Sequence, residues 1–141
     1  MAESIAKGAR ENECNVILKN ISETKIEDLL SADAVIIGSP TYYGTMAAEV
    51  KGLLDESVKY HGKLKGKIGG AFASSGMIGG GNETTIMSIL MALLIHGMIV
   101  QGNTEIGHYG PVAIGAPDDR ANKECIKYGR RLGELTMRLA K

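Results

Sequence analysis

The stretch Ala34-Val35-Ile36-Ile37-Gly38-Ser39-Pro40-Thr41-Tyr42-Tyr43-Gly44 decides the fold of this chain. Its first half is an apolar, β-branched run that stops at Gly38, which predicts a strand covered on both faces, as in parallel sheets. A polar loop with two tyrosines follows, and a helical pattern begins after Gly44. Open α/β sheets bind their ligands at the carboxyl ends of such strands. The hydroxyls, backbone amides and flat aromatic faces of this loop suit a planar ring with polar atoms at its edge.

Outward from this stretch, helical and strand patterns alternate along the whole chain. The patterns predict strands at residues 15–19, 34–38, 68–73 and 98–100, and helices near 2–11, 26–30, 46–58, 82–96 and 119–141. A long loop is expected at residues 101–117. Alternation of this kind predicts an α/β protein with a parallel sheet and helices on both faces. Residues 1–141 contain no internal repeat, so we expect a single domain.

The composition excludes several kinds of partner. Sixteen Lys and Arg residues balance sixteen Asp and Glu residues, whereas nucleic acids and anionic membranes demand a basic surface. The only two cysteines, Cys14 and Cys125, lie far apart, which indicates reduced thiols in a cytoplasmic protein. The chain shows no signal-peptide pattern at its N-terminus, and the apolar run Ile86–Ile95 is too short to span a bilayer. No group of residues has the spacing of a metal site or a catalytic triad.

A second loop, Ser74–Gly81, follows the strand predicted at 68–73 and directly precedes a helix. Its glycines leave backbone N–H groups free to bind an anion or the electron-rich edge of a ring. It is neither a Walker loop nor the dinucleotide-binding fingerprint. Taken alone, the loop could equally be a flexible connector.

Together, the two loops resemble those of flavodoxin-like, FMN-binding NAD(P)H:quinone oxidoreductases of the tryptophan-repressor-binding-protein type. The matching segments are Gly38–Gly44 with Met46, Phe72–Gly76, Gly79–Thr85 and His96–Met98. The likeness runs from the first predicted helix to the last. It implies a flavodoxin-like doubly wound sheet, FMN as cofactor, and transfer of electrons from the co-substrate NAD(P)H through the flavin to a small-molecule quinone.

The resemblance also implies which residues hold the flavin. The two loops would bind the isoalloxazine ring, and His96 would approach it, from a neighbouring subunit. The implied cofactor-binding residues are Ser39, Pro40, Thr41, Tyr42, Tyr43, Gly44, Ser74, Ser75, Gly76, Met77, Ile78, Gly79, Gly80 and His96. The family often has a basic residue where Tyr42 stands. His96 also ends an apolar helix, where a histidine can instead bond the last helical carbonyls. We expect no catalytic side chain, because the flavin carries the chemistry.

Other functions stay open at this point. A flavodoxin-type electron carrier would use the same loops, although its acidic docking face is not expected from a neutral charge balance. An interaction module that holds no flavin is a third interpretation. The helix Ile86–Ile95 is apolar on nearly every side, which predicts a subunit contact in a homodimer or homotetramer. Burial of that helix under its own neighbours is the alternative.

Compared with the family, the chain lacks the first strand and its phosphate loop, because Met1–Ser4 already falls in the equivalent of the first helix. The true product could start upstream, the sheet could close with four strands, or copies could exchange elements. We expect FMN to bind much more weakly than to a complete relative, since that loop and helix anchor the phosphate. A titration with FMN followed by flavin fluorescence measures this affinity. Tight, stoichiometric quenching would contradict the expectation.

Overall fold

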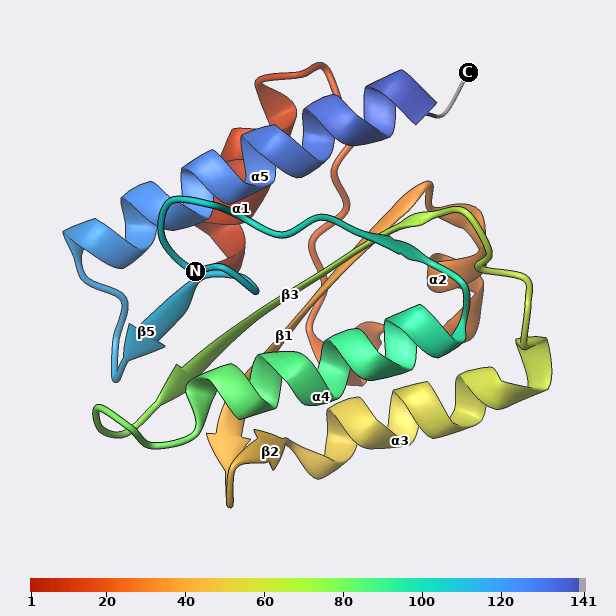
Figure 1. Cartoon of the computed structure of the whole chain (residues 1–141). Helices are drawn as coiled ribbons and strands as arrows, with labels where there is room; N and C mark the ends of the chain where they lie inside the picture. Colours follow the sequence, from red (N-terminus) through yellow and green to blue (C-terminus); the bar gives the residue numbers. More distant parts are fainter. Residues whose placement is uncertain (140–141) are drawn as a thin grey trace.

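A computed structural model describes residues 1–139. Strands and helices alternate along the chain, with the helices on both sides of one sheet (Figure 1). The elements are α1 (Ala2–Arg10), η1 (Ile21–Glu23), α2 (Ile26–Ser31), β1 (Ala34–Tyr42), β2 (Thr45–Met46), α3 (Ala48–Glu56), η2 (Ser57–Tyr60), β3 (Ile68–Ser75), α4 (Asn82–Ile95), β4 (Ile99–Val100), β5 (Val112–Ile114) and α5 (Asp119–Leu139). The predicted α/β class with a parallel sheet is confirmed.

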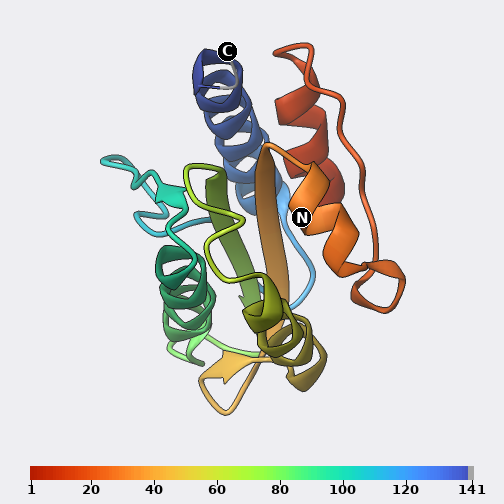
Figure 2. The ribbon, with the colours of Figure 1, turned by 90° about the vertical axis from the view of Figure 1, so that its right-hand side faces the viewer.

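The sheet is built around β3. β1 runs parallel to β3 in a register that extends from Ala34 opposite Ile68 to Pro40 opposite Ser74. β4 and β5 pair with the other edge of β3, also in parallel, while β2 forms a short antiparallel hairpin with β1. Because β1, β3 and β5 point the same way, their carboxyl ends meet at one edge of the sheet. Figure 2 shows α4 and α1 on opposite sides of β1 and β3.

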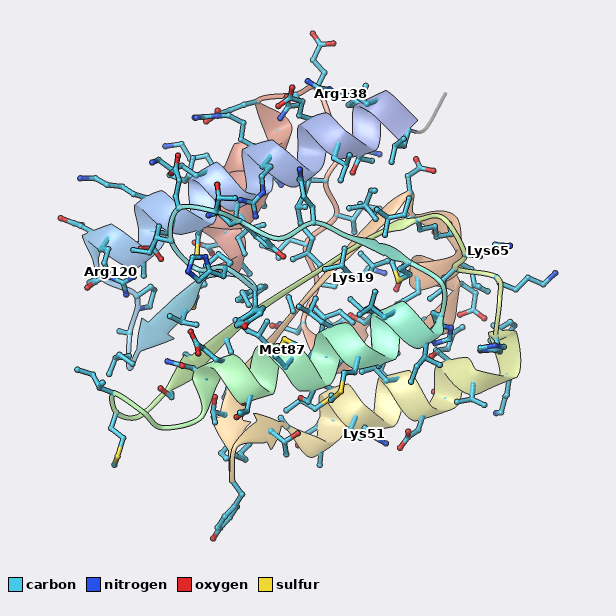
Figure 3. The ribbon with its side chains drawn as sticks, in the orientation of Figure 1. Lys19, Lys51, Lys65, Met87, Arg120 and Arg138 are labelled. Atoms are coloured by element: carbon cyan, nitrogen blue, oxygen red, sulfur yellow. The ribbon has the colours of Figure 1, made fainter. Side chains whose placement is uncertain are left out.

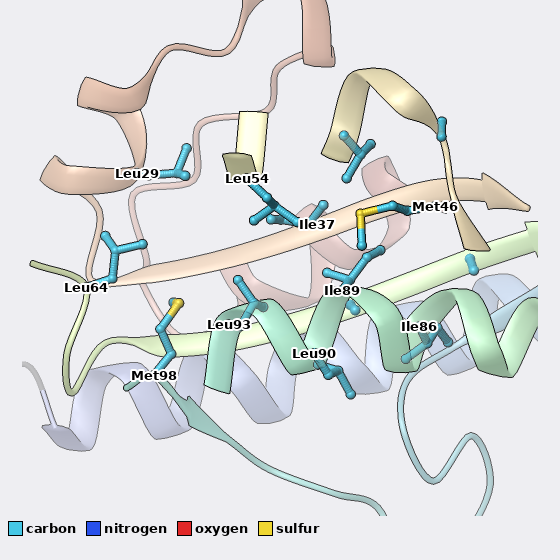
Figure 4. Packing of buried hydrophobic residues seen from close by; sticks show 14 residues of the cluster. Leu29, Ile37, Met46, Leu54, Leu64, Ile86, Ile89, Leu90, Leu93 and Met98 are labelled. Carbon is cyan, nitrogen blue, oxygen red and sulfur yellow. The ribbon is translucent and has the colours of Figure 1, made fainter. Parts of the chain in front are cut away.

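Side chains alternate between the two faces of the strands and form two cores. On one face, Ile37, Ala71 and Ala73 pack against α3 and α4 in the larger cluster. Figure 4 shows how α4 directs Ile86, Ile89, Leu90 and Leu93 into this cluster. All four side chains are at most 3% exposed. On the other face, Ile68 packs with Ile5 of α1 and with Cys125, Tyr128 and Leu132 of α5. Both faces of the sheet are therefore covered, as the apolar strand at 34–38 predicts.

The helices α1 and α5 touch backbone to backbone. A Cβ atom built on Gly8 would lie 2.0 Å from the carbonyl oxygen of Ile126, and one on Gly129 would lie 1.9 Å from that of Ile5. A side chain at either glycine would separate the helices. Gly129 and Gly133 therefore serve the close helix packing that their spacing in the sequence permits.

Three sequence-based expectations on local structure were wrong. Residues 15–19 form no strand: no neighbouring strand supplies hydrogen bonds in the described chain, and Ile17 is 70% exposed. The helix expected near 46–58 begins only at Ala48, because Thr45 and Met46 pair with β1 as β2. β5 lies inside the region expected to be a loop, because three residues are too few for a visible alternating pattern. The edge of β1 that faces away from β3 has no paired strand along Ala34–Pro40 within residues 1–139.

The cysteines are free, as predicted. Cys14 is partly buried, and Cys125 is fully buried on the inner side of α5. Burial raises the pKa of the Cys125 thiol to about 11, which makes it a poor nucleophile. Among residues 1–139, no three His, Cys, Asp or Glu side chains come together in a way that could hold a metal ion. None of the described helices combines the length and apolar character needed to cross a membrane.

Candidate functional site

The first loop folds as a tight hairpin rather than an open loop. β1 continues past Gly38 to Tyr42, and the turn at Tyr43 and Gly44 leads back into β2. Both turn residues have positive φ angles, 50° at Tyr43 and 77° at Gly44, as two-residue hairpin turns require. Tyr43 is fully exposed, and Tyr42 is 60% exposed. The hairpin therefore presents aromatic side chains to solvent at the carboxyl edge of the sheet.

The second loop connects β3 to α4 at the same edge. Its backbone turns tightly, with the N–H of Gly80 donating to the carbonyl of Met77 at 3.1 Å. The Ser75 hydroxyl donates to the same carbonyl at 2.9 Å and accepts from the side-chain amide of Asn82 at 3.2 Å. Met77 and Ile78, at the tip, are 68% and 89% exposed. The loop is thus fixed at its base and carries apolar side chains outward.

Direct contacts join the two loops. A Cβ atom on Gly81 would lie only 2.8 Å from Cα of Gly44, so the backbones approach too closely for any side chain. The Thr84 hydroxyl donates to the Gly44 carbonyl at 2.7 Å. Thr85, which is buried, places its hydroxyl oxygen 3.0 Å from that of Thr41. We refer to residues 39–44 and 74–81 together as the two-loop site.

Thr84 and Thr85 are site-forming residues that fall in a segment matching the family but were not among the expected cofactor-binding residues. They occupy the first turn of α4, immediately after the glycine-rich loop. Two adjacent hydroxyls in that position were the available signal, because hydroxyl side chains at the start of a helix bond to nearby backbone. Their role is to hold the hairpin against the loop rather than to extend the surface.

Ser39 has a similar internal role. Its side chain is 5% exposed, accepts a hydrogen bond from the Ala47 N–H at 2.9 Å and donates to the Pro40 carbonyl at 2.7 Å. It therefore fixes the hairpin to the start of α3. Pro40 is exposed and pairs in register with Ser74, which brings the two loops side by side. All the predicted loop residues, from Ser39 to Gly44 and from Ser74 to Gly80, thus gather at one place.

The two-loop site suits the ring of a flavin better than its phosphate. Exposed Tyr42, Tyr43, Met77 and Ile78 offer apolar surface, and the glycine-rich loop offers backbone N–H groups for the ring's polar edge. Neither loop contains a Lys or Arg residue. α1 begins at the same edge, since Ser4 donates to Asn122 near the start of α5. The N–H groups of its first turn are the backbone donors available for a phosphate there.

His96 does not belong to this cluster. It follows the last residue of α4, whereas the two-loop site lies at the first, about 20 Å away along the helix axis. Its ring is 6% exposed, and Nε2 lies 2.8 Å from the Ser57 hydroxyl, which itself donates to the Leu54 carbonyl. Nε2 is therefore the donor. The ring bonds Ser57 and not the last carbonyls of α4, so the expected role at the end of this helix was wrong. An approach to a neighbouring subunit's flavin stays a prediction.

Protonation of His96 should destabilise the fold. Burial, and then the neighbouring His61 ring at 6.0 Å, lower the pKa of His96 below 6.5. The unfolded chain binds a proton near pH 6.5, so the unfolded state holds more protons at mildly acidic pH. The stability is fully present above about pH 6.5 and is lost as the pH falls toward the lower pKa of the folded state. Urea unfolding between neutral and mildly acidic pH should show this loss.

A His96→Gln variant should flatten this pH dependence, whereas His108→Gln should keep it. His108 lies exposed on the loop between β4 and β5, where Nδ1 contacts the carbonyl of Asn103. An unchanged pH dependence in His96→Gln would show that another group is responsible.

Comparisons with known proteins agree with this geometry. The model of the NADPH-dependent FMN reductase family matches residues 8–109. A flavodoxin of Aquifex aeolicus is 43% identical over 143 aligned positions, which cover 95% of this chain and 77% of that protein. An NAD(P)H dehydrogenase (quinone) of Archaeoglobus fulgidus is 29% identical and is aligned over 99% of this chain and 91% of its own length.

Solved structures give the same result for the fold. A flavodoxin, WrbA-like protein from Agrobacterium tumefaciens superposes with a TM-score of 0.79 at 26% identity, covering 97% of this chain and 87% of that one. The predicted flavodoxin-like fold is thereby confirmed, and FMN is the cofactor that the family match indicates. The chain belongs to the NADPH-dependent FMN reductase family.

Proposed function

We propose that this protein is an FMN-dependent oxidoreductase that takes electrons from NAD(P)H and passes them to quinones. The observation that carries the proposal is the junction of the hairpin and the glycine-rich loop at Gly44 and Gly81, which forms one site from two sequence-distant segments. The Archaeoglobus fulgidus relative, named as an NAD(P)H dehydrogenase (quinone), supports the choice of substrates. When bound, FMN supplies the two-electron redox chemistry that the side chains lack.

In this proposal the protein binds and orients the flavin ring. Tyr42 and Tyr43 provide aromatic surface against the ring, and the backbone amides of residues 76–80 bond to its polar edge. Thr41 is held by Thr85 and keeps the hairpin at a fixed distance from α4. Neither loop contains His, Cys, Lys, Arg, Asp or Glu, so the phenols of Tyr42 and Tyr43 are the acid–base groups that the two loops contain. The site therefore works mainly by position.

A steady-state assay tests this function. Oxidation of NADH and NADPH by benzoquinone is measured with the protein alone, with added FMN, and with FMN alone. Turnover that requires both protein and FMN, and that exceeds the rate of free FMN, is the expected result. No turnover above that background, at FMN concentrations that saturate binding, would overturn the enzymatic proposal.

An electron carrier is the second candidate, and the 43% identity to the Aquifex aeolicus flavodoxin favours it specifically. A carrier would bind FMN in the same two-loop site but would not be reduced by NAD(P)H directly. Saturable flavin binding without turnover, together with reduction by dithionite, identifies this function.

We further propose that copies of this chain associate through α4. The outer side of this helix carries Met91, Leu94 and Ile95, which are 54%, 53% and 72% exposed. Met87 lies on the same helix but is partly buried against the core, so it is not counted in this surface (Figure 3). Exposed apolar surface of this density is typical of a subunit interface. Met side chains adapt readily to such a contact.

Ile95→Glu should convert an oligomer into monomers, as measured by size-exclusion chromatography with light scattering. Ile17→Glu is the matched control, because Ile17 is similarly exposed, at 70%, but lies far from α4 in the chain. Dissociation by Ile17→Glu alone would place the contact at the exposed segment around Ile17 instead. A monomeric unmodified protein would rule out the association.

A further inference from the structure

A cleft lies away from the two-loop site, between α5 and the loop that connects β4 to β5. It is an open cleft of about 300 Å³. The loop contributes Glu105 to its rim, and α5 contributes Glu124, Lys127, Tyr128 and Arg131. None of its lining residues belongs to the two-loop site. The flavin proposal therefore does not account for the groups that this cleft contains.

At one end of the cleft, the carboxylate of Glu124 has an oxygen that lacks a hydrogen-bond donor in the described chain. Its side chain is only 10% exposed. One carboxylate oxygen, Oε1, accepts from Nη1 of Arg120 at 2.7 Å. The other, Oε2, is buried and has no hydrogen-bond partner within residues 1–139. A buried carboxylate oxygen without a donor is costly, so a donor that enters the cleft would be strongly bound.

Arg131, at the other end of the cleft, has a donor that lacks an acceptor in the part of the chain that the structure describes. Its Nε atom is buried and has no acceptor among the described residues. Its guanidinium lies 5.3 Å from the centre of the Tyr128 ring, which positions the charge without neutralising it. Burial lowers the pKa of Arg131, and the attraction of Tyr128 and Glu105 opposes this only in part. An Nε–H group and its neighbouring Nη form the fork that binds carboxylate or phosphate side-on.

The other charges of the cleft are already engaged. Arg130 pairs with Glu11, and Lys127 lies 3.8 Å from Glu105 at an exposed rim where such pairs contribute little. Tyr128 is 4% exposed and accepts the Ala71 N–H at 3.0 Å, while burial raises its pKa to about 12. The hydroxyl of Tyr128 therefore stays neutral, and the Tyr128 side chain is a fixed part of the cleft wall. Arg131 and Glu124 are the two groups left for a ligand.

We propose that this cleft binds a small linear molecule with a carboxylate or phosphate at one end and a hydrogen-bond donor, an ammonium or hydroxyl group, at the other. The oxyanion pairs with Arg131, and the donor end pairs with Oε2 of Glu124. The two residues are seven positions apart on one helix, which separates them by about 10 Å along its axis. The site is independent of the flavin and requires no redox step.

Isothermal titration calorimetry with simple probes tests this proposal. ε-Aminocaproate carries both ends, caproate lacks the ammonium, and n-hexylamine lacks the carboxylate. ε-Aminocaproate should bind at least about tenfold more tightly than either of the others, because two charge-assisted hydrogen bonds act together. Aminohexyl phosphate distinguishes the two possible oxyanions by its affinity relative to ε-aminocaproate. Failure of both double-ended probes to bind would overturn the proposal.

Variants locate the site. Arg131→Gln and Glu124→Gln should each reduce the affinity for ε-aminocaproate about tenfold or more, because each leaves one end of the probe unpaired. Arg138→Gln is the matched control, since Arg138 lies on α5 outside the cleft and pairs with Glu134 (Figure 3). Circular dichroism shows whether each variant is folded. If Arg131→Gln does not fold, Glu124→Gln decides the outcome. Equal affinity in all folded variants would contradict the assigned site.

Discussion

Gly129→Ala is expected to lower the free energy of unfolding by about 2–3 kcal/mol, because the added methyl group cannot be accommodated. Its Cβ atom would lie 1.9 Å from the carbonyl oxygen of Ile5, a backbone atom that cannot rotate away. α1 would have to move off α5, and the core between them, which includes Ile5, Cys125 and Tyr128, would open. Urea unfolding, followed by circular dichroism, measures the change.

Gly52→Ala is the matched control for this prediction. Gly52 lies in the interior of α3, and no atom would come within 4 Å of its added Cβ. Alanine is the better helix former by about 1 kcal/mol, so this variant should be stabilised. The same substitution should therefore have opposite signs on the two helices. Stabilisation by both would show that α1 and α5 do not pack as closely as described.

Gly81→Ala should weaken FMN binding at least about tenfold, because it pushes apart the two segments that form the site. Gly81 has a φ angle of 92°, and its Cβ would lie 2.8 Å from Cα of Gly44. The hairpin would shift, and the hydrogen bond from Thr84 to the Gly44 carbonyl would be lost. Flavin fluorescence quenching during an FMN titration measures the affinity.

Gly62→Ala separates this effect from general backbone strain. Gly62 has a similar φ angle of 84°, but nothing lies within 4 Å of its added Cβ, and it is remote from both loops in the chain. Gly62→Ala should lower the free energy of unfolding by roughly 1–2 kcal/mol without changing the affinity for FMN. Equal loss of FMN affinity in the two variants would mean that the approach of Gly44 to Gly81 does not matter for binding.

Much of this fold follows from local patterns in the sequence. The apolar runs at 34–38 and 68–73 are strands because both of their faces are covered, and the helix predicted near 82–96 ends just before Gly97, which has a φ angle of 78°. The segment 15–19 has an apolar composition suited to a strand, yet it forms none. Strand formation depends on a neighbouring strand, which a local pattern cannot reveal.

The candidate site was predictable in its position but not in its construction. The order of strands places both loops at one edge of the sheet, and this much follows from alternation alone. The threonine hydroxyls that join the loops depend on which face of α4 turns toward the hairpin. The burial of His96 against Ser57 likewise depends on the packing of η2 beneath the end of α4. Contacts of this kind are set by tertiary structure, so a local pattern could not reveal that His96 bonds Ser57.

The central claim is that residues 39–44 and 74–81 together bind the flavin ring. Two-dimensional ¹H–¹⁵N NMR of the protein during an FMN titration tests it most directly, because each backbone amide reports its own surroundings. Saturable shifts are expected, and they should be largest at the amides of Thr41–Gly44 and Ser75–Gly81. Shifts centred on His96 and Ser57, or on the cleft beside Arg131, would contradict it, as would a spectrum that FMN does not change.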